Sequence, residues 1–144
     1  MRPTINVWAS GSKIGGASGF ENLVRHSRIL GGDLDADIVG VISDIDEGGV
    51  KARANKLRIP FHYFPKPWTA ERYREKAVAC GGEWNAFSGW MKLMKGLAPE
   101  TSFNIHPARL VILRPDGTPR FGGKGRVKET FVRLIFMYRG STTS

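Results

Sequence analysis

Short apolar runs alternate with segments of helical periodicity between residues 4 and 106. The apolar runs lie at 4–9, 37–43, 59–64, 83–89 and 102–106. Apolar side chains recur at helical spacing at 19–30, 48–57 and 70–79. Strands connected by helices in this order run parallel and have both faces of their sheet covered. The pattern therefore predicts an α/β protein with a Rossmann-like, open, mostly parallel sheet and helices on both faces.

Threonine and glycine mark the predicted helix ends. Thr69 is suited to cap the helix at 70–79, because its hydroxyl can accept a hydrogen bond from the first turn. A glycine pair follows that helix at 81–82, and another pair at 31–32 follows the first helix. Glycine readily takes the left-handed backbone that ends helices, so both pairs predict helix ends.

A chain of 144 residues is long enough for one domain with a hydrophobic core. We assign residues 1–110 to the α/β domain and residues 111–144 to a C-terminal extension of the same domain. In that extension, "VILRPDGTPRF" predicts two short strands joined by a Pro-Asp-Gly turn. The apolar and basic stretch that follows is compatible with helix or with strand.

The formal net charge of +9 predicts an anionic partner. Nucleic acid is one such partner, but no RNA-recognition signature or dense basic run accompanies the charge. Small phosphorylated or polycarboxylate molecules are the other class. We therefore expect small-molecule substrates rather than nucleic acid, and the sequence carries no signal for an oligomeric state.

The composition also argues against a membrane, a disulfide and a metal. The longest apolar runs are too short to span a bilayer, and the N-terminus lacks the core of a signal peptide. Cys80 is the only cysteine, which excludes an internal disulfide and a cysteine-based zinc site. We interpret Cys80 as a small apolar residue at a helix end. A cytoplasmic protein without a metal is expected.

The glycine-rich segment "SGSKIGGASG", residues 10–19, connects the first predicted strand to the first helix. Ligands of parallel α/β sheets bind beyond the carboxyl ends of the strands, and free N–H groups of a first helical turn attract anions. The spacing from Gly11 is that of a P-loop, but Ala17 stands where the phosphate-binding lysine belongs. The segment predicts a phosphate pocket without nucleotide identity, to which Ser18 can add its hydroxyl. A plain strand-to-helix turn is the alternative.

Asn104 and His106 lie two residues apart at the end of the fifth predicted strand, directly before Pro107. In an extended segment both side chains face the same side and can reach one reacting centre. Imidazole exchanges protons near neutrality, and an amide can donate to an oxygen that gains negative charge. From spacing alone, a hydrogen-bonded histidine in a turn is the simpler interpretation.

Four motifs in one order resemble the phosphoribosylglycinamide formyltransferase family. "NIHP", preceded by "SGWMKLMKGLAP", is similar to that family's "AG-(F/Y)-MRIL-SP…NIHPSLLP" region. "VISDIDEGGVKARANKLRIP" resembles its "VISN…A…G…RA…GIP" segment, and "VWASG…GASGFENLV" resembles "VLISGNGSNLQAI". The resemblance covers residues 4 to about 110, and "PRFGGKG" extends it to residue 125.

This resemblance implies formyl transfer from 10-formyltetrahydrofolate, as co-substrate, to the amine of 5'-phosphoribosylglycinamide in purine biosynthesis, without a metal. Asn104 would stabilise the developing oxyanion, and His106 would assist proton and charge movement. The residues implied for the substrate phosphate are Ala17, Ser18 and Gly19. Those implied for folate are Met91, Lys92, Leu93, Met94 and Asn104. For the two methionines, core packing is the alternative interpretation.

The chain also departs from the family's pattern. Gly19 replaces an asparagine, and Ala70 stands where the family has a folate-contacting arginine, with Arg72 and Lys66 as candidates to replace it. No segment matches the family's downstream catalytic aspartate, since Asp116 lies in a turn signature. The chain is shorter than family members, and the resemblance ends after "GGKG". This implies a truncated, frame-shifted or divergent C-terminus.

Other functions stay open beside the leading one. Formyltransferases that act on methionyl-tRNA or on a nucleotide amino-sugar share the Asn-x-His arrangement, and the basic tail favours tRNA among these substrates. A non-catalytic module that binds a phosphate ligand is favoured by the missing aspartate.

Overall fold

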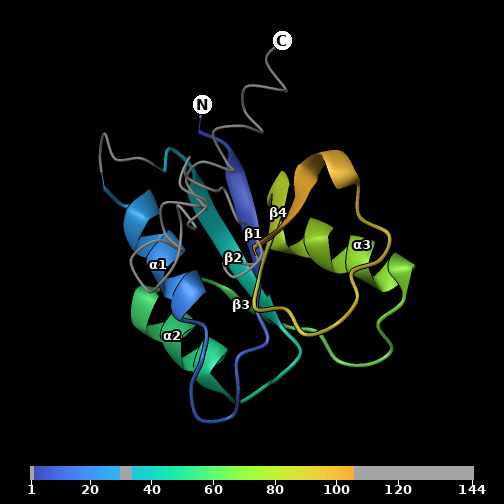
Figure 1. Ribbon diagram of the computed structural model, residues 1–144, viewed down its shortest axis with the longest axis horizontal. Helices are drawn as coiled ribbons and strands as arrows, with labels where there is room; N and C mark the ends of the chain where they lie inside the picture. Colours follow the sequence, from blue (N-terminus) through green and yellow to red (C-terminus); the bar gives the residue numbers. More distant parts are fainter. Residues whose placement is uncertain (1, 30–33, 106–144) are drawn as a thin grey trace, which may run out of the picture. The chain divides into compact units, whose positions relative to one another are not determined.

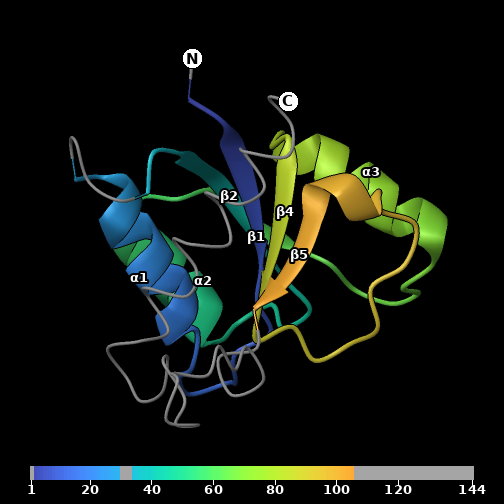
Figure 2. The same cartoon turned by 45° about the horizontal axis from the view of Figure 1, so that its top comes forward.

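The computed structural model describes residues 2–29 and 34–105. In this part of the chain, five strands form one sheet in the order β3-β2-β1-β4-β5 (Figure 1). The strands are β1 (Thr4–Trp8), β2 (Asp37–Ser43), β3 (Phe61–Tyr63), β4 (Trp84–Ser88) and β5 (Ser102–Ile105). β1 pairs in parallel with β2 and β4, and β2 pairs in parallel with β3. β5 runs in the same direction beside β4 (Figure 2), so the predicted parallel sheet is confirmed.

Helices cover both faces of this sheet, as the sequence predicts. The helices are α1 (Ser18–Ser27), α2 (Gly49–Leu57) and α3 (Ala70–Cys80). α1 and α2 lie on one face and α3 lies on the other (Figure 1). Right-handed crossovers from β1 to β2 and from β2 to β3 move outward on one face, whereas the return to β4 passes over the opposite face. The strand order therefore reverses between β1 and β4, which makes this pair the switch point where such sheets bind ligands.

An aromatic cluster fills the space between the sheet and α3. The indole of Trp8 packs against Phe64, Tyr73, Phe87 and Trp90, with ring centroids 5.2 to 5.8 Å apart. All five side chains are buried. Aromatic pairs in these stacked and edge-on arrangements contribute about 0.5–1.5 kcal/mol each beyond their burial. Because three of the five residues, Trp8, Phe64 and Trp90, lie at or after the carboxyl ends of strands, the cluster also supports the loops at that edge.

Two buried asparagines hold β4 beside β1. The Asn6 amide donates to the side-chain oxygen of Asn85 and to the carbonyl of Ala77, both at 3.1 Å. The indole N–H of Trp8 donates to the same oxygen of Asn85 at 3.0 Å, and the Gly82 N–H donates to the Asn6 side chain at 2.7 Å. Buried polar groups that are satisfied in this way specify one arrangement of neighbouring elements. The register at the switch point is therefore set by side chains as well as by the strands.

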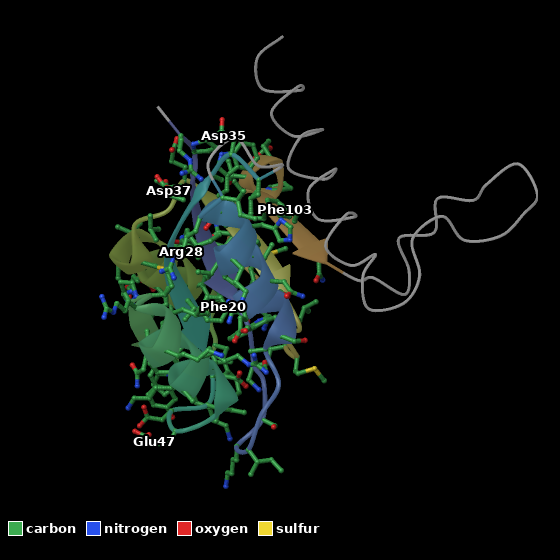
Figure 3. All side chains as sticks on the ribbon, turned by 90° about the vertical axis from the view of Figure 1, so that its left-hand side faces the viewer. Phe20, Arg28, Asp35, Asp37, Glu47 and Phe103 are labelled. Atoms are coloured by element: carbon green, nitrogen blue, oxygen red, sulfur yellow. The ribbon has the colours of Figure 1, made fainter. Side chains whose placement is uncertain are left out.

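The helix α1 ends earlier than the sequence predicts. The glycine pair at 31–32 predicts an end near residue 30, but the last helical residue is Ser27. The N–H groups of Arg28 and Ile29 donate to carbonyl groups three residues earlier, which tightens the final turn. The Arg28 guanidinium donates to the carbonyl of Leu57 at the end of α2. Figure 3 shows the side of the sheet that α1 and α2 cover, with Arg28 and the buried Phe20 of α1 labelled. This contact between the two helices fixes Arg28 directly after the last residue of α1, whereas the glycine pair lies outside the described residues.

The described residues up to Asn104 form one compact unit. None of the helices among the described residues is long and apolar enough to cross a membrane. The predicted extension at 111–144, with its strand-turn-strand segment, lies outside the described residues.

Candidate functional site

One buried serine joins the carboxyl ends of three strands. Ser10 follows β1 and is 2% exposed. Its N–H donates to the Gly89 carbonyl at 3.2 Å, and its hydroxyl oxygen accepts a hydrogen bond from the Met91 N–H at 3.0 Å. The Ser43 hydroxyl at the end of β2 donates to the Ser10 carbonyl at 3.2 Å. The segments predicted to bind phosphate and folate therefore leave the sheet from one hydrogen-bonded point, at the switch point.

The glycine loop, residues 10–17, is a compact turn held by its own serine. The Ser12 N–H donates to the Gly15 carbonyl at 2.9 Å, and the Gly15 N–H donates to the Ser12 hydroxyl at 3.0 Å. Three of its residues have left-handed backbones, namely Gly11, Gly16 and Ala17. Glycine takes that conformation without strain, whereas Ala17, with φ of 65°, does not. The left-handed backbone at Ala17 costs free energy, so contacts with neighbouring segments must stabilise the loop where it enters α1.

The residues predicted to bind the substrate phosphate lie together at the N-terminus of α1. Ala17 occupies the N-cap position but makes no side-chain cap, and Ser18 is exposed to solvent. The N–H groups of a first turn without a side-chain cap can serve an anion. A Cβ on Gly19 would lie 2.4 Å from the hydroxyl oxygen of Ser88, so the backbone of α1 closely approaches the end of β4. This proximity explains why a glycine suits the position where the resembling family has asparagine.

The segment predicted to bind folate, Met91–Met94, follows β4 as a loop. Met91 and Leu93 are 79% and 78% exposed, while Met94 is partly buried against the aromatic cluster. The Tyr73 hydroxyl donates to the Leu93 carbonyl at 3.0 Å and accepts from the indole N–H of Trp90 at 3.1 Å. The core-packing interpretation therefore fits Met94 and does not fit Met91. The loop itself is tethered at the backbone of Met91 and of Leu93.

Lys92 makes two electrostatic contacts from this loop. Its ammonium nitrogen lies 3.2 Å from Asp44, directly after β2, and 3.8 Å from the ring centroid of Trp68. The Asp44 side chain is only 9% exposed. A cation over an indole face gains from the ring quadrupole as well as from the carboxylate. Lys92 thus connects the loop after β4 to the end of β2 and to the chain before α3.

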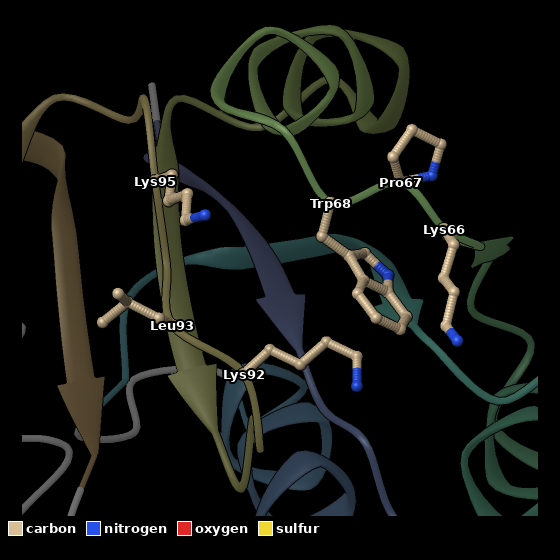
Figure 4. A pocket seen from close by; sticks show the side chains of 6 residues that line it. All are labelled: Lys66, Pro67, Trp68, Lys92, Leu93 and Lys95. Atoms are coloured by element: carbon tan, nitrogen blue, oxygen red, sulfur yellow. The ribbon is translucent and has the colours of Figure 1, made fainter.

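A pocket of about 420 Å³ opens beside this lysine (Figure 4). Its lining residues are Lys66, Pro67, Trp68, Lys92, Leu93 and Lys95. The ammonium nitrogen of Lys66 lies 5.8 Å from the centroid of the Trp68 ring. Three lysines and one indole give the pocket a flat apolar wall with a positive rim, which suits a planar ligand that carries carboxylates.

The structure distinguishes the two candidates to replace the arginine missing at position 70. The Arg72 guanidinium donates to the carbonyls of Pro65 and Pro67, both at 2.8 Å, and lies over the Phe64 ring. These contacts commit Arg72 to the shape of the chain before α3. Lys66, in contrast, lines the pocket. Lys66 is therefore the better placed of the two for a ligand.

The two predicted catalytic residues are described unequally. Asn104 is exposed on β5, and the preceding Phe103 is buried with its ring 6.5 Å from that of Trp84. β5 is the neighbour of β4, so Asn104 belongs to the same sheet as the glycine loop and the Met91–Met94 segment. His106 and Asp116 lie outside the described residues, and the Asn104–His106 pair stays a prediction.

Sequence reasoning missed several residues that shape this edge of the sheet. They are Ser10, Asp44, Trp68, Tyr73 and Lys95. Two of them had a usable signal, because Ser10 and Asp44 are polar residues that closely follow buried strands. Trp68 and Tyr73 act through partners in distant segments, and Lys95 is placed by the pocket that it lines. Within 2–29 and 34–105, no group of three or more His, Cys, Asp or Glu side chains could hold a metal ion.

In sequence, no protein-family model and no curated protein matches the chain. Its structure is similar to several solved structures. The phosphoribosylglycinamide formyltransferase from Brucella melitensis superimposes with a TM-score of 0.67 at 21% identity, covering 96% of this chain and 94% of that one. The glycinamide ribonucleotide transformylase 1 from Symbiobacterium toebii superimposes with a TM-score of 0.63 at 21% identity, covering 90% of this chain and 59% of that one. A formyltetrahydrofolate deformylase from Pseudomonas putida KT2440 superimposes with a TM-score of 0.56 at 21% identity, covering 74% of this chain and 38% of that one.

These similarities confirm the resemblance at the level of the fold. The chain has the α/β fold of the N-terminal part of formyltransferases. It spans little more than a third of the deformylase. Because enzymes that transfer and enzymes that hydrolyse the formyl group share this fold, the reaction has to be argued from the site.

Proposed function

We propose that the chain transfers a formyl group from 10-formyltetrahydrofolate to the amine of 5'-phosphoribosylglycinamide, as a cytoplasmic enzyme of purine biosynthesis. One observation carries the proposal. The glycine loop and the Met91–Met94 segment leave the sheet from the same serine, at the switch point of a formyltransferase fold. A phosphate ligand and a folate ligand bound to these two segments would lie next to each other.

The ribonucleotide phosphate would bind at the N-terminus of α1. The backbone N–H groups of Ala17, Ser18 and Gly19 and the Ser18 hydroxyl are the donors in this proposal. The exposure of Ser18 and the absence of a side-chain cap at Ala17 support it, because both leave donors available to an anion. The close approach of Gly19 to Ser88 keeps this turn next to β4.

The folate would lie along the Met91–Met94 segment, with its anionic end in the pocket of Figure 4. The indole of Trp68 offers a flat surface to an aromatic ring, and Lys66 and Lys95 offer charge to carboxylates. The exposed side chains of Met91 and Leu93 supply apolar contact beside it. These contacts would hold the formyl group toward the sheet edge.

The chemistry needs no change of oxidation state. The amine nitrogen attacks the formyl carbon, a new C–N bond forms, and the bond from that carbon to the folate nitrogen breaks. The Asn104 amide would donate to the formyl oxygen while it carries negative charge. His106 would take the proton from the attacking amine and return one to the departing folate nitrogen.

A transfer assay with purified full-length chain tests this proposal. Wild type should convert 5'-phosphoribosylglycinamide to its formyl derivative, followed by mass spectrometry. N104A should lower the rate about 100-fold to 1,000-fold, because an oxyanion donor is lost. H106A should lower it by about 100-fold or more. A wild type that neither transfers the group nor binds either ligand would overturn the proposal.

A non-catalytic phosphate-binding module is the second candidate. The observation that favours it is the lack of any match to the family's downstream aspartate. Calorimetry that detects the ribonucleotide while the assay detects no turnover would support this candidate. Competition assays with methionyl-tRNA and a nucleotide amino-sugar would separate related amine substrates, and formate release without an amine would indicate hydrolysis.

A further inference from the structure

The N-terminus of α2 lies directly against the glycine loop. The Gly49 N–H donates to the Ser12 carbonyl at 2.8 Å. A Cβ on Gly49 would lie 2.1 Å from the Gly15 carbonyl oxygen, and a Cβ on Gly48 would lie 2.7 Å from the Ser12 carbonyl oxygen. Backbone therefore meets backbone here, and only glycine permits the contact without a shift.

A second contact lies one helical turn further along α2. The Arg53 Nε donates to the Gly16 carbonyl at 2.6 Å, and its Nη1 pairs with Glu21 of α1 at 2.8 Å. Gly16 immediately precedes Ala17, the left-handed residue that leads into α1. Arg53 thus contacts the end of the loop, while Gly49 contacts its middle, at Ser12 and Gly15.

The guanidinium of Arg53 is itself held in place. Glu21 is 15% exposed and also pairs with Arg25 and Lys56, each at 2.9 Å. A carboxylate shared by three cations in this way orients each of them more strongly than an isolated surface pair does. The bond from Arg53 to the loop therefore belongs to a network and is not a free side chain resting on the surface.

The loop needs such support because its own sequence does not define one conformation. Glycines widen the range of accessible backbone angles, and Ala17 is held in a left-handed conformation that costs free energy. The direction of the first N–H groups of α1 depends on this conformation. Whatever holds the loop consequently also aims those donors.

We propose that α2 positions the phosphate site, with Gly49 and Arg53 as positioning residues that set the shape of the glycine loop. The inference rests on the proposed function, in that Ala17, Ser18 and Gly19 at the first turn of α1 bind the phosphate. Neither Gly49 nor Arg53 needs to touch the ligand. Their effect is to place the donors of Ala17, Ser18 and Gly19.

Two variants with matched controls test this. G49A adds a methyl group that would collide with the Gly15 carbonyl, although alanine favours the helix. G15A adds the same methyl group at a position where none of the described residues lies within 4 Å. R53Q removes the bond to Gly16, whereas K56Q removes a cation from the same Glu21 oxygen and keeps that bond. R53K serves as the conservative rescue variant.

Amide hydrogen exchange of the ligand-free full chain gives the first readout. In G49A and R53Q, the bonded amides of Ser12, Gly15 and Glu21 should exchange about tenfold faster than in wild type. In G15A and K56Q, the exchange rates of these amides should stay within about twofold of wild type. R53K should recover part of the protection that R53Q loses.

Calorimetry with 5'-phosphoribosylglycinamide and with 10-formyltetrahydrofolate gives the second readout. G49A and R53Q should lower the affinity for the ribonucleotide about tenfold and leave the affinity for the folate within about twofold of wild type. Equal weakening of both ligands, or unchanged exchange in both variants, would overturn the role of α2. If wild type binds no ribonucleotide, the proposed function fails, while the exchange rates still decide whether α2 shapes the loop.

Discussion

The ammonium nitrogen of Lys92 lies 3.2 Å from Oδ2 of Asp44, and this pair connects the loop after β4 to the end of β2. The Asp44 side chain is 9% exposed, and its other oxygen, Oδ1, is buried with no hydrogen-bond partner among the described residues. A carboxylate in that position depends on one cation for most of its stabilisation. The pair is therefore a point where a single substitution has a large effect.

Replacing Lys92 by methionine should destabilise the chain by about 2–3 kcal/mol, because it leaves the buried Asp44 charge without its partner. Urea denaturation followed by tryptophan fluorescence measures the change. K95M is the matched control, since Lys95 is exposed in the same pocket, and it should stay within about 0.5 kcal/mol.

Adding D44N to K92M should recover part of the loss, since a neutral amide is less costly to bury than an unpaired carboxylate. A K92M protein as stable as K95M would contradict this account of the pair.

Replacing Tyr73 by phenylalanine should cost about 1–3 kcal/mol, because the Leu93 carbonyl loses its donor and the Trp90 N–H loses its acceptor. It should also loosen the Met91–Met94 loop, measured as faster amide exchange at Met91. Y63F is the control, because Tyr63 is 39% exposed on β3, and its unfolding free energy should hardly change. Equal losses in the two variants would contradict the tether.

Glu21 should make the unfolding free energy of the chain depend on pH in the acidic range. Hydrogen bonds from Lys56, Arg25 and Arg53 lower the pKa of Glu21 from 4.5 to about 2. A carboxyl whose pKa is depressed by folding stabilises the fold fully above its unfolded pKa, and this contribution is lost as the pH falls through the folded one. The difference in unfolding free energy between wild type and E21Q should therefore be largest above pH 4.5 and shrink toward pH 2. Urea titrations across that range measure it, and a difference that stays constant with pH would contradict it.

Cys80 should be inert in the folded chain. It is the last residue of α3 and 7% exposed, and burial raises the pKa of its thiol to about 12. Because the thiolate is the reactive form, iodoacetamide at pH 8 should label the native chain at least about 100-fold more slowly than the chain in urea. Mass spectrometry measures the rates. Equal labelling of the two forms would show that the thiol is accessible.

Most of the architecture was predictable because it follows from local periodicity. The strands at β1, β2 and β4 and the helix α3 lie within one residue of their predicted bounds. Thr69 caps α3 by accepting from the Arg72 N–H, and Gly81 ends it with a left-handed backbone, as the sequence predicts. Each of these features depends on the preferences of neighbouring residues, which is the information that a single sequence carries best.

Features that depend on contacts between distant segments were not predictable in this way. The helix α1 ends at Ser27, three residues before the predicted end, and Arg28 then contacts the Leu57 carbonyl at the end of α2. In the sequence, Trp68 is one more aromatic residue in a proline-containing loop. Only the folded chain shows that Lys92 lies over its ring. The catalytic and ligand-binding roles implied by the resemblance stay predictions, and His106 itself lies outside the described residues.

The order of strands and helices, the parallel sheet and the carboxyl edge to which the polar loops belong all follow from the amino-acid sequence. Hydrophobic periodicity and right-handed crossovers are sufficient for these, because they act on short stretches of chain. The folded chain was needed to show that Ser10 joins the two candidate binding loops and that Asp44 holds Lys92 beside Trp68. It likewise shows that Gly49 and Arg53 of α2 support the glycine loop. These contacts form between residues far apart in the chain, where burial and distance, rather than local preference, select the partner.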